Sequence, residues 1–219
     1  MFTRKHDSDV SVIAGRKSAI FGAGLICGVA VFLSAMAAPP KPQSPPIAPQ
    51  EVVLMLDPAR CKVHYSVDAT LHTVHGTFNL KSGSVRFDPD SGKAAGEIVV
   101  YATSGDSGNS SRDEKMHKEV LESSKYPDAV FHPMQVEGKV ARTGGSDVKL
   151  RGVILLHGQE HEIVAPIHAQ LSADRWTGTA SFTVPFIQWG MTDPSNWLLK
   201  VKPVVRVELE MAGSAKNSK

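Results

Sequence analysis

The chain has 219 residues, 42% of them hydrophobic, and a formal net charge of +2, which suits one globular domain preceded by a leader. Residues 1–38 hold four of the basic and two of the acidic residues, so the remainder carries 20 of each. The domain is therefore close to neutral, which argues against nucleic acid as a partner. Cys61 is the only cysteine after residue 38, which excludes a disulfide within the domain.

The N-terminal segment predicts export from the cytoplasm. Four basic residues lie within the first 17 positions, and residues 18–38 contain no charge. Ala35-Met36-Ala37 resembles a signal-peptidase site and favours a cleaved signal peptide. As a helix, residues 18–38 would also span roughly 30 Å, so an N-terminal membrane anchor stays as the alternative. Leu25-Ile26-Cys27 lacks the small residue that precedes a lipid-modified cysteine. We expect a periplasmic or extracellular domain.

Proline content and strand periodicity define the domain boundaries. Residues 39–50 contain six prolines in twelve positions and predict an extended linker. We expect the folded domain to occupy residues 51–214 and residues 215–219 to form a disordered tail.

One short helix is predicted in the middle of this domain. Ser111 and Glu114 have the spacing of a capping box, and Pro127 ends the helical region. Met116 and Leu121 belong to its apolar face. Since so short a helix is unstable alone in water, this face must pack against the rest of the domain. A single helix among strands is most simply a lid or a plug.

The remaining sequence has the period-two alternation of strands. The alternating runs cover residues 54–56, 62–69, 71–80, 85–87, 97–103, 129–132, 136–141, 148–157, 162–170, 176–184 and 201–211. Lys81-Ser82-Gly83 and Gly158-Gln159-Glu160 are predicted turns. Many short strands without helical crossovers predict an antiparallel sandwich or barrel, and closure would remove exposed sheet edges. A barrel of about eight strands encloses packed side chains or one slender ligand.

Several segments, in this order and spacing, carry a family resemblance. They are Val63-His64-Tyr65-Ser66-Val67, His75-Gly76-Thr77-Phe78, Ser82-Gly83-Ser84-Val85-Arg86-Phe87, Arg112-Asp113-Glu114-Lys115-Met116-His117, Lys125-Tyr126-Pro127 and Leu150-Arg151-Gly152-Val153-Ile154. Together they resemble the YceI-like family of secreted, lipocalin-like β-barrel proteins. The resemblance implies an all-β, eight-stranded antiparallel barrel with one inserted helix. It also implies non-enzymatic binding, storage or transport of a long-chain polyisoprenoid or similar lipid, without a cofactor.

The apolar phase of each strand, together with the helix, predicts the residues that would line a lipid cavity. They are Phe78, Val100, Met116, Leu121, Leu150, Ile154, Phe182 and Val207. A packed core would show the same alternation, so a filled barrel that binds a protein partner stays open as an alternative. The sequence also leaves open a homodimer and association with a membrane through the N-terminal segment.

The histidines of the domain raise one further alternative, a metal-dependent hydrolase. His72 and His75, or His157 and His161, could each supply two ligands. Residues three apart on a strand point to opposite faces, however, and the sequence contains no HExxH helix or cysteine pair that would complete a site. Nor does it contain the Gly-x-Ser-x-Gly elbow of a serine hydrolase. We therefore predict neither a metal site nor catalytic residues.

Overall fold

The computed structural model describes residues 51–217, so the predicted export segment and linker lie outside the described residues. Nine strands form a single antiparallel sheet. The strands are β1 (Val52–Leu56), β2 (Lys62–Ala69), β3 (Thr73–Phe87), β4 (Ala94–Asp106), β5 (Asp128–Glu137), β6 (Gly144–Leu156), β7 (Gln159–Ser172), β8 (Arg175–Val184) and β9 (Val201–Asn217). The helical segment consists of α1 (Ser110–Lys115) and the π turn η1 (Met116–Val120). Within residues 51–217, no helix is both long enough and apolar enough to cross a membrane.

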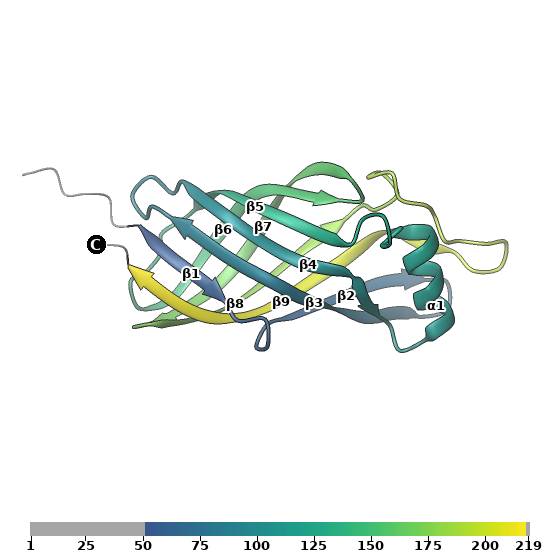
Figure 1. Ribbon diagram of the computed structural model, residues 1–219, viewed down its shortest axis with the longest axis horizontal. Helices are drawn as coiled ribbons and strands as arrows, with labels where there is room; N and C mark the ends of the chain where they lie inside the picture. Colours follow the sequence, from purple (N-terminus) through teal and green to yellow (C-terminus); the bar gives the residue numbers. More distant parts are fainter. Residues whose placement is uncertain (1–50, 218–219) are drawn as a thin grey trace, which may run out of the picture. The chain divides into compact units, whose positions relative to one another are not determined.

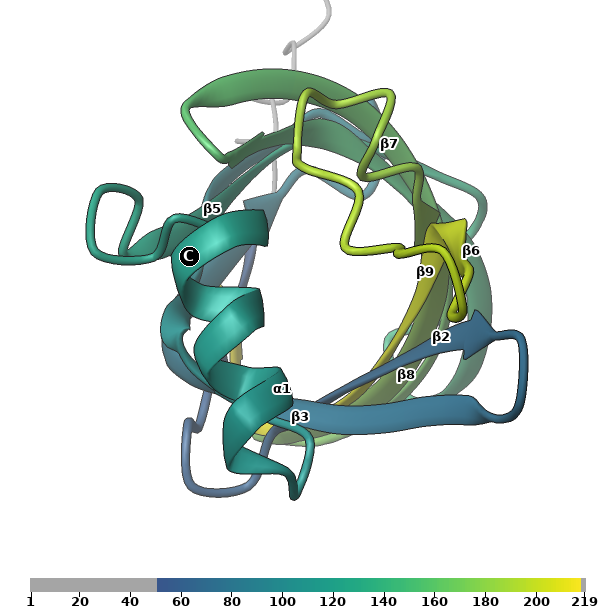
Figure 2. The same cartoon turned by 90° about the vertical axis from the view of Figure 1, so that its right-hand side faces the viewer.

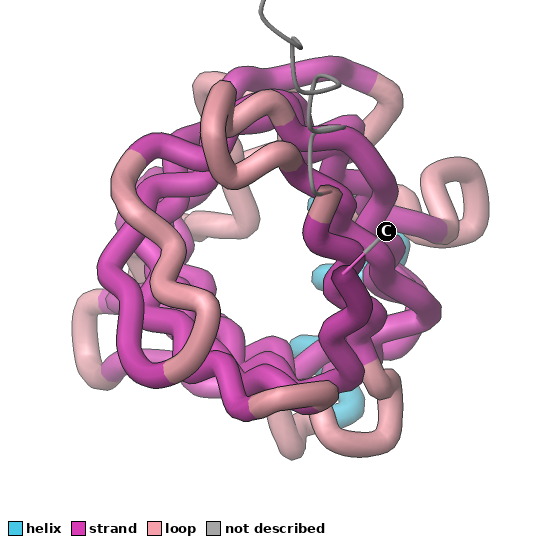
Figure 3. Tube along the Cα trace, turned by 90° about the vertical axis from the view of Figure 1, so that its left-hand side faces the viewer, coloured by secondary structure: helices cyan, strands magenta, loops and turns pink. Residues whose placement is uncertain are grey.

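The sheet closes on itself, which confirms the predicted barrel. Its strand order is β1-β3-β2-β9-β8-β7-β6-β5-β4, and pairing of β3 with β4 completes the ring. Figure 1 shows the barrel from the side, with α1 at one end, and Figure 3 shows the ring of strands from the opposite end. Because the ring is complete, residues 51–217 leave no long sheet edge to pair with another chain.

The ring has eight positions, because β1 and β2 occupy one position in succession. β2 pairs with the first half of β3 and of β9, as in Val63 opposite Phe78 and Leu209. β1 pairs with the second halves of the same two strands, so that Val52 lies opposite Phe87 and Asn217. A position that looks like one long strand is therefore two short strands, separated by a loop at residues 57–61.

This arrangement corrects two boundaries predicted from the sequence. The segment Lys81-Ser82-Gly83 is not a turn: β3 runs through it, and its register against β4 shifts between Leu80 and Ser82. Turns and bulges share the same small residues, and here the irregularity lies where β3 exchanges β2 for β1 as its neighbour. The tail predicted from residue 215 is wrong for residues 215–217, which belong to β9 and pair with β1.

Two glycines on the interior face make room for aromatic rings. A Cβ at Gly76 would overlap the ring of Tyr65, and a Cβ at Gly152 would overlap the ring of Phe131 and the carbonyl oxygen of His132. Both positions follow the apolar phase of their strands, so each glycine leaves space on the inner face of the barrel. The structure shows that the space is taken by a neighbouring side chain.

The helix begins two residues earlier than the capping box predicts. Asn109 is the N-cap, and its side-chain oxygen accepts a hydrogen bond from the Arg112 backbone N–H at 3.0 Å. Asparagine is among the strongest N-cap residues, so it competes well with Ser111. The helix then widens into the π turn, where the Leu121 N–H donates to the Met116 carbonyl at 2.8 Å. This turn brings Met116 and Leu121 to the same side of the helix.

The end of the barrel that contains β1 is packed with side chains. Leu56, Leu80 and Trp176 belong to one buried cluster, and Phe87 and Val136 belong to a second. The indole N–H of Trp176 donates to the Met55 carbonyl at 3.2 Å, which satisfies the polar atom of an otherwise buried ring. This end is therefore a solid core.

Replacement of Cys61 by serine is expected to be tolerated. Cys61 is a free, half-buried thiol whose sulfur lies 3.4 Å from the Ala212 backbone nitrogen and 3.5 Å from the Ala212 carbonyl oxygen. A serine hydroxyl can replace these weak contacts, so Cys61→Ser should cost about 1 kcal/mol in the free energy of unfolding. Urea denaturation measures this cost. A loss several times larger would show that the thiol has a further role.

Candidate functional site: an apolar cavity inside the barrel

The other end of the barrel is hollow. A cavity of about 530 Å³ is lined by side chains from β2 to β9, from the helix and from the β8–β9 loop (residues 185–200). Figure 2 looks at the barrel from this end, where the helix and the loop lie at the rim of the ring. Because the opposite end is a solid core, the cavity has its mouth at the helix end.

All eight predicted site residues lie on the wall of this cavity. They are Phe78, Val100, Met116, Leu121, Leu150, Ile154, Phe182 and Val207. They meet there because alternate residues of every strand face the inside of the ring. The hollow also shows in their burial: Phe78, Val100, Phe182 and Val207 point inward yet are only half-buried. Within residues 51–217, no large side chain falls below 2% exposure.

The dimensions of the cavity suit a single extended chain. Along β9 its wall runs from Val201 to Met211. With about 3.4 Å per residue and the tilt of barrel strands, this stretch corresponds to roughly 25 Å along the barrel axis. The volume divided by this length gives a mean cross-section of roughly 20 Å², the section of one hydrocarbon chain.

Polar side chains are confined to the mouth of the cavity, with one exception. His72, Arg112, Lys115 and Asn196 belong to the rim, where β2–β3, the helix and the β8–β9 loop meet. Beneath the helix, the Tyr65 hydroxyl of β2 donates to the sulfur of Met116 at 3.6 Å. Burial is the largest cause that raises the pKa of Tyr65, so this phenol stays neutral. The cavity thus offers an apolar interior and a polar entrance.

The helix covers part of the mouth and is held there by hydrogen bonds. The ring nitrogens of His117 lie 3.0 Å from the Ser123 hydroxyl and 3.0 Å from the Gly105 carbonyl. Lys115 Nζ donates to the Pro194 carbonyl at 3.0 Å and so joins the helix to the β8–β9 loop. The predicted lid therefore has two parts, the helix and this loop.

The β8–β9 loop is the part of the site that sequence reasoning missed. It contributes Phe186, Met191 and Leu199 to the cavity wall. No periodic pattern marks them, because the loop has no regular secondary structure. The ring of Trp189 stacks on His161 of β7, with centroids 4.1 Å apart and planes 3° apart, which fixes the loop to the barrel.

This stacked pair predicts that the barrel loses stability in mild acid. Burial lowers the pKa of His161 below its usual value near 6.5, and its buried Nε2 has no hydrogen-bond partner among the described residues. The unfolded chain therefore binds a proton more readily than the folded one. The stabilisation that comes from neutral His161 is complete above about pH 6.5. It is lost as the pH falls through the lower pKa that His161 has in the folded state. His161→Phe keeps the stack but removes the proton, so urea midpoints between pH 5 and 7.5 should vary less. Equal pH dependence in variant and wild type would contradict this assignment.

His157 and His161, one of the two histidine pairs proposed as metal ligands, have other partners. His157 Nε2 lies 2.7 Å from a carboxylate oxygen of Glu122, and the ring packs against Tyr126. His161 stacks on Trp189 instead of turning toward His157. In the part of the chain that the structure describes, no three His, Cys, Asp or Glu side chains form a metal-binding group.

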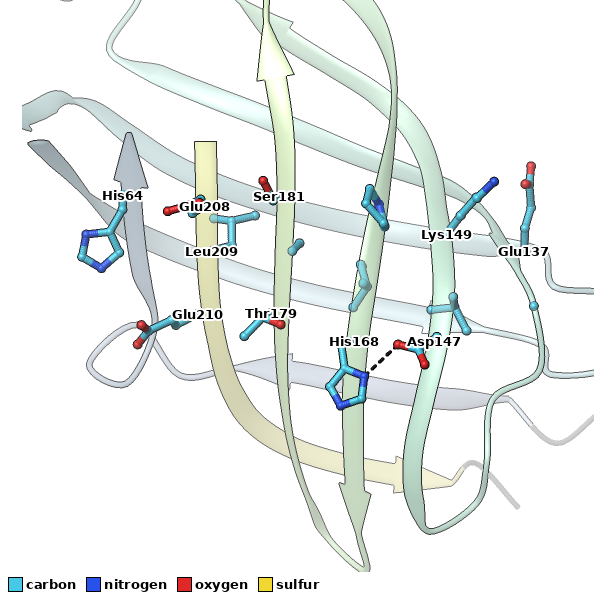
Figure 4. A pocket seen from close by; sticks show the side chains of 15 residues that line it. His64, Glu137, Asp147, Lys149, His168, Thr179, Ser181, Glu208, Leu209 and Glu210 are labelled. Carbon is cyan, nitrogen blue, oxygen red and sulfur yellow. Dashed lines mark hydrogen bonds and ion pairs between the residues drawn. The ribbon is translucent and has the colours of Figure 1, made fainter. Parts of the chain in front are cut away.

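A second hollow lies on the outside of the barrel and is more polar than the interior cavity. It has a volume of about 820 Å³ and is lined by outward-facing residues such as His64, Glu208 and Glu210 (Figure 4). His168 and Asp147 make a 2.7 Å contact there, but their side chains are 62% and 88% exposed. Water reaches such a surface from most directions. The outer hollow therefore cannot remove a ligand from water as the interior cavity can.

Fold and cavity together define a class: a closed antiparallel barrel with a narrow apolar cavity at one end, an architecture that it shares with lipocalins. The sequence profile of the YceI-like domain matches residues 54–212. The chain therefore belongs to the YceI-like family, which confirms the resemblance seen in the sequence.

Two solved structures share the fold. One is BcnA from Burkholderia cenocepacia, with 14% identity and a TM-score of 0.59 over 72% of this chain and 99% of that chain. The other is a polyisoprenoid binding domain from Saccharophagus degradans, implicated in plant cell wall breakdown, with 19% identity and a TM-score of 0.57 over 74% and 98%. A search of curated proteins finds no match. At these identities the similarity establishes the fold alone.

Proposed function

We propose that this protein binds, stores or transports a long-chain isoprenoid or a related single-chain lipid outside the cytoplasm, without catalysing a reaction. The observation that carries the proposal is the one-ended apolar cavity, whose wall is hydrocarbon apart from its mouth and Tyr65. The similar domain from Saccharophagus degradans, described as polyisoprenoid binding, supports the same class of ligand.

The physical basis of binding is the removal of apolar surface from water. Each Å² of hydrocarbon that enters the cavity contributes roughly 25 cal/mol, so a chain that fills it is held tightly without any strong polar contact. Arg112, Lys115 and Asn196 at the mouth would meet the polar end of the lipid, while its tail extends toward Leu150. The chemistry of the wall therefore selects for a slender tail more than for a particular headgroup.

The proposal is tested by mass spectrometry of an organic extract of protein purified from its native host. We expect an isoprenoid or related single-chain lipid in near-stoichiometric amount. The proposal would be contradicted if the purified, folded protein contained no extractable lipid and also took up none from detergent solution.

Export is a separate part of the proposal and rests on residues 1–38. The uncharged stretch at residues 18–38 follows basic residues and precedes the proline-rich linker, as expected for a signal peptide or an anchor. Intact-mass measurement distinguishes the two, because cleavage near Ala37 removes the whole apolar stretch. A full-length chain in the cytoplasmic fraction would contradict export.

A further inference from the structure

The rim of the cavity mouth exposes large apolar side chains. Trp197 is 89% exposed, Leu198 is 66% exposed and Leu71 is 77% exposed. Trp197 and Leu198 lie in the β8–β9 loop, and Leu71 lies in the β2–β3 turn. In Figure 1 the loop extends beyond the strands, at the same end as α1. Exposed clusters of this kind mark surfaces that contact a partner or a membrane.

These residues belong to one surface because their two segments are hydrogen-bonded to each other. The Thr70 N–H donates to the Lys200 carbonyl at 2.9 Å, and the Lys200 N–H donates to the Thr70 hydroxyl at 3.0 Å. Leu71 follows Thr70 directly, and Leu198 precedes Lys200 by two residues. The loop tip and the turn therefore form a single apolar rim, defined here as Leu71, Trp197 and Leu198.

The tip of the loop is held in one conformation. The side-chain oxygen of Asn196 accepts hydrogen bonds from the Leu198 N–H at 2.9 Å and the Leu199 N–H at 2.7 Å. The Asn196 N–H in turn donates to the Leu199 carbonyl at 2.8 Å. The backbone thus presents Trp197 and Leu198 to the outside while Leu199 points to the cavity wall, and little conformational entropy is left to lose on docking.

The size and charge of the rim point to a lipid surface. The three side chains expose roughly 450 Å², short of the 800 Å² or so that each partner buries in a stable protein interface. The charges beside the rim largely balance: Lys202 pairs with Asp68 at 2.9 Å and Lys115 with Glu119 at 3.9 Å, and the exposed Lys200 lies near Asp193. Such a rim has little charge to attract a strongly acidic or basic partner. Tryptophan and leucine on a small protrusion are the residues that enter a bilayer interface.

We propose that the apolar rim docks the cavity mouth on the surface of a lipid bilayer, where Trp197 and Leu198 enter the interface and lipid passes directly between membrane and cavity. This inference rests on the proposed function for its purpose, but the docking itself does not require a bound ligand. Cavity-wall residues Asn196 and Leu199 adjoin the inserted tip. Leu199 therefore extends the apolar surface of Leu198 into the cavity, past the polar side chains of the mouth, and gives a hydrocarbon chain a short path between bilayer and cavity.

The test uses the full chain reconstituted with phosphatidylcholine vesicles that contain brominated acyl chains and no isoprenoid. Bromine quenches only tryptophans that lie close to the acyl region. We expect quenching in the wild type that Trp197→Phe abolishes. Trp189→Phe is the matched control, because Trp189 lies in the same loop but stacks on His161, and it should keep the quenching. Equal quenching in Trp197→Phe and wild type, or none in the wild type, would overturn the proposal.

Transfer kinetics separate docking from ligand binding. In the double variant Leu71→Ser, Leu198→Ser, uptake of an isoprenoid from vesicles should slow at least tenfold, while final occupancy after loading from detergent stays unchanged. Docking without isoprenoid uptake would contradict the proposed function alone. Uptake at the wild-type rate, or a dimer in sedimentation that Leu198→Ser dissociates, would instead overturn the docking proposal.

Discussion

Val207→Trp is expected to abolish lipid uptake and leave the ligand-free barrel as stable as the wild type. Val207 faces inward between Tyr65 of β2 and Phe182 of β8, yet it is only half-buried, because it borders the empty part of the cavity. The indole would occupy the space of the ligand. Displacing 100–200 Å² of ligand contact corresponds to roughly 2.5–5 kcal/mol, a loss of about 100-fold or more in affinity. Titration with a fluorescent isoprenoid measures affinity, and thermal unfolding measures stability.

The matched control is Val204→Trp, which makes the same replacement on the outward face of β9. Val204 is 40% exposed, so its indole would lie outside the barrel and leave affinity unchanged. If the inward variant instead loses 1–3 kcal/mol without ligand, the penalty of an overpacked core, the cavity is filled by side chains and the carrier hypothesis is wrong.

Gly152→Ala is expected to lower the stability of the barrel strongly, although it adds only one methyl group. Gly152 lies in the middle of β6, where a Cβ would overlap both the Phe131 ring and the His132 carbonyl oxygen on β5. A backbone atom cannot move aside as a flexible side chain can. We expect a loss of about 2–4 kcal/mol in the free energy of unfolding and a fall of roughly 5–15 °C in Tm.

Gly145→Ala is the control on the same strand. Its Cβ would come no closer than 3.3 Å to another atom, the side-chain oxygen of Gln170, so the change should be close to neutral. Phe131 also lines the cavity, and the alanine would push its ring toward the ligand. Weaker lipid binding should therefore accompany the fall in Tm. Similar Tm values for the two variants would show that β5 and β6 can separate without cost.

The strands and their inward faces could be predicted from the sequence, because alternation fixes which residues share a side of the sheet. Continuing the same alternation along β2 and β9 would also have identified Tyr65 and Val205, which line the cavity together with the predicted residues. Alternation does not report how much space lies between opposite walls. Ile154 and Val207 both line the cavity and have the same pattern, but Ile154 is buried, at 9% exposure, while Val207 is only half-buried.

The predictions failed where small polar residues permit more than one local structure. Ser82-Gly83 suits a turn as well as a strand irregularity, and only the passage from β2 to β1 beside β3 decides between them. The turn between β6 and β7 is His157-Gly158, with φ values of 53° and 75°, one residue earlier than predicted. The β8–β9 loop has no periodicity, so its contribution to the cavity depends on tertiary contacts such as the Trp189–His161 stack.

The divided position in the ring has a consequence for the order of folding. β1 is placed by pairing with the last residues of β9, as in Val52 opposite Asn217, and the Asp57 N–H donates to the Ala212 carbonyl at 2.9 Å. These partners are separated by almost the whole domain, so their pairing carries a large loop-closure cost and is expected to form late. A ribosome-bound or C-terminally shortened chain lacks the strand segment that positions β1. The barrel can thus close only after β9 has been synthesised, and until then β1 is without the strand that holds it in the ring.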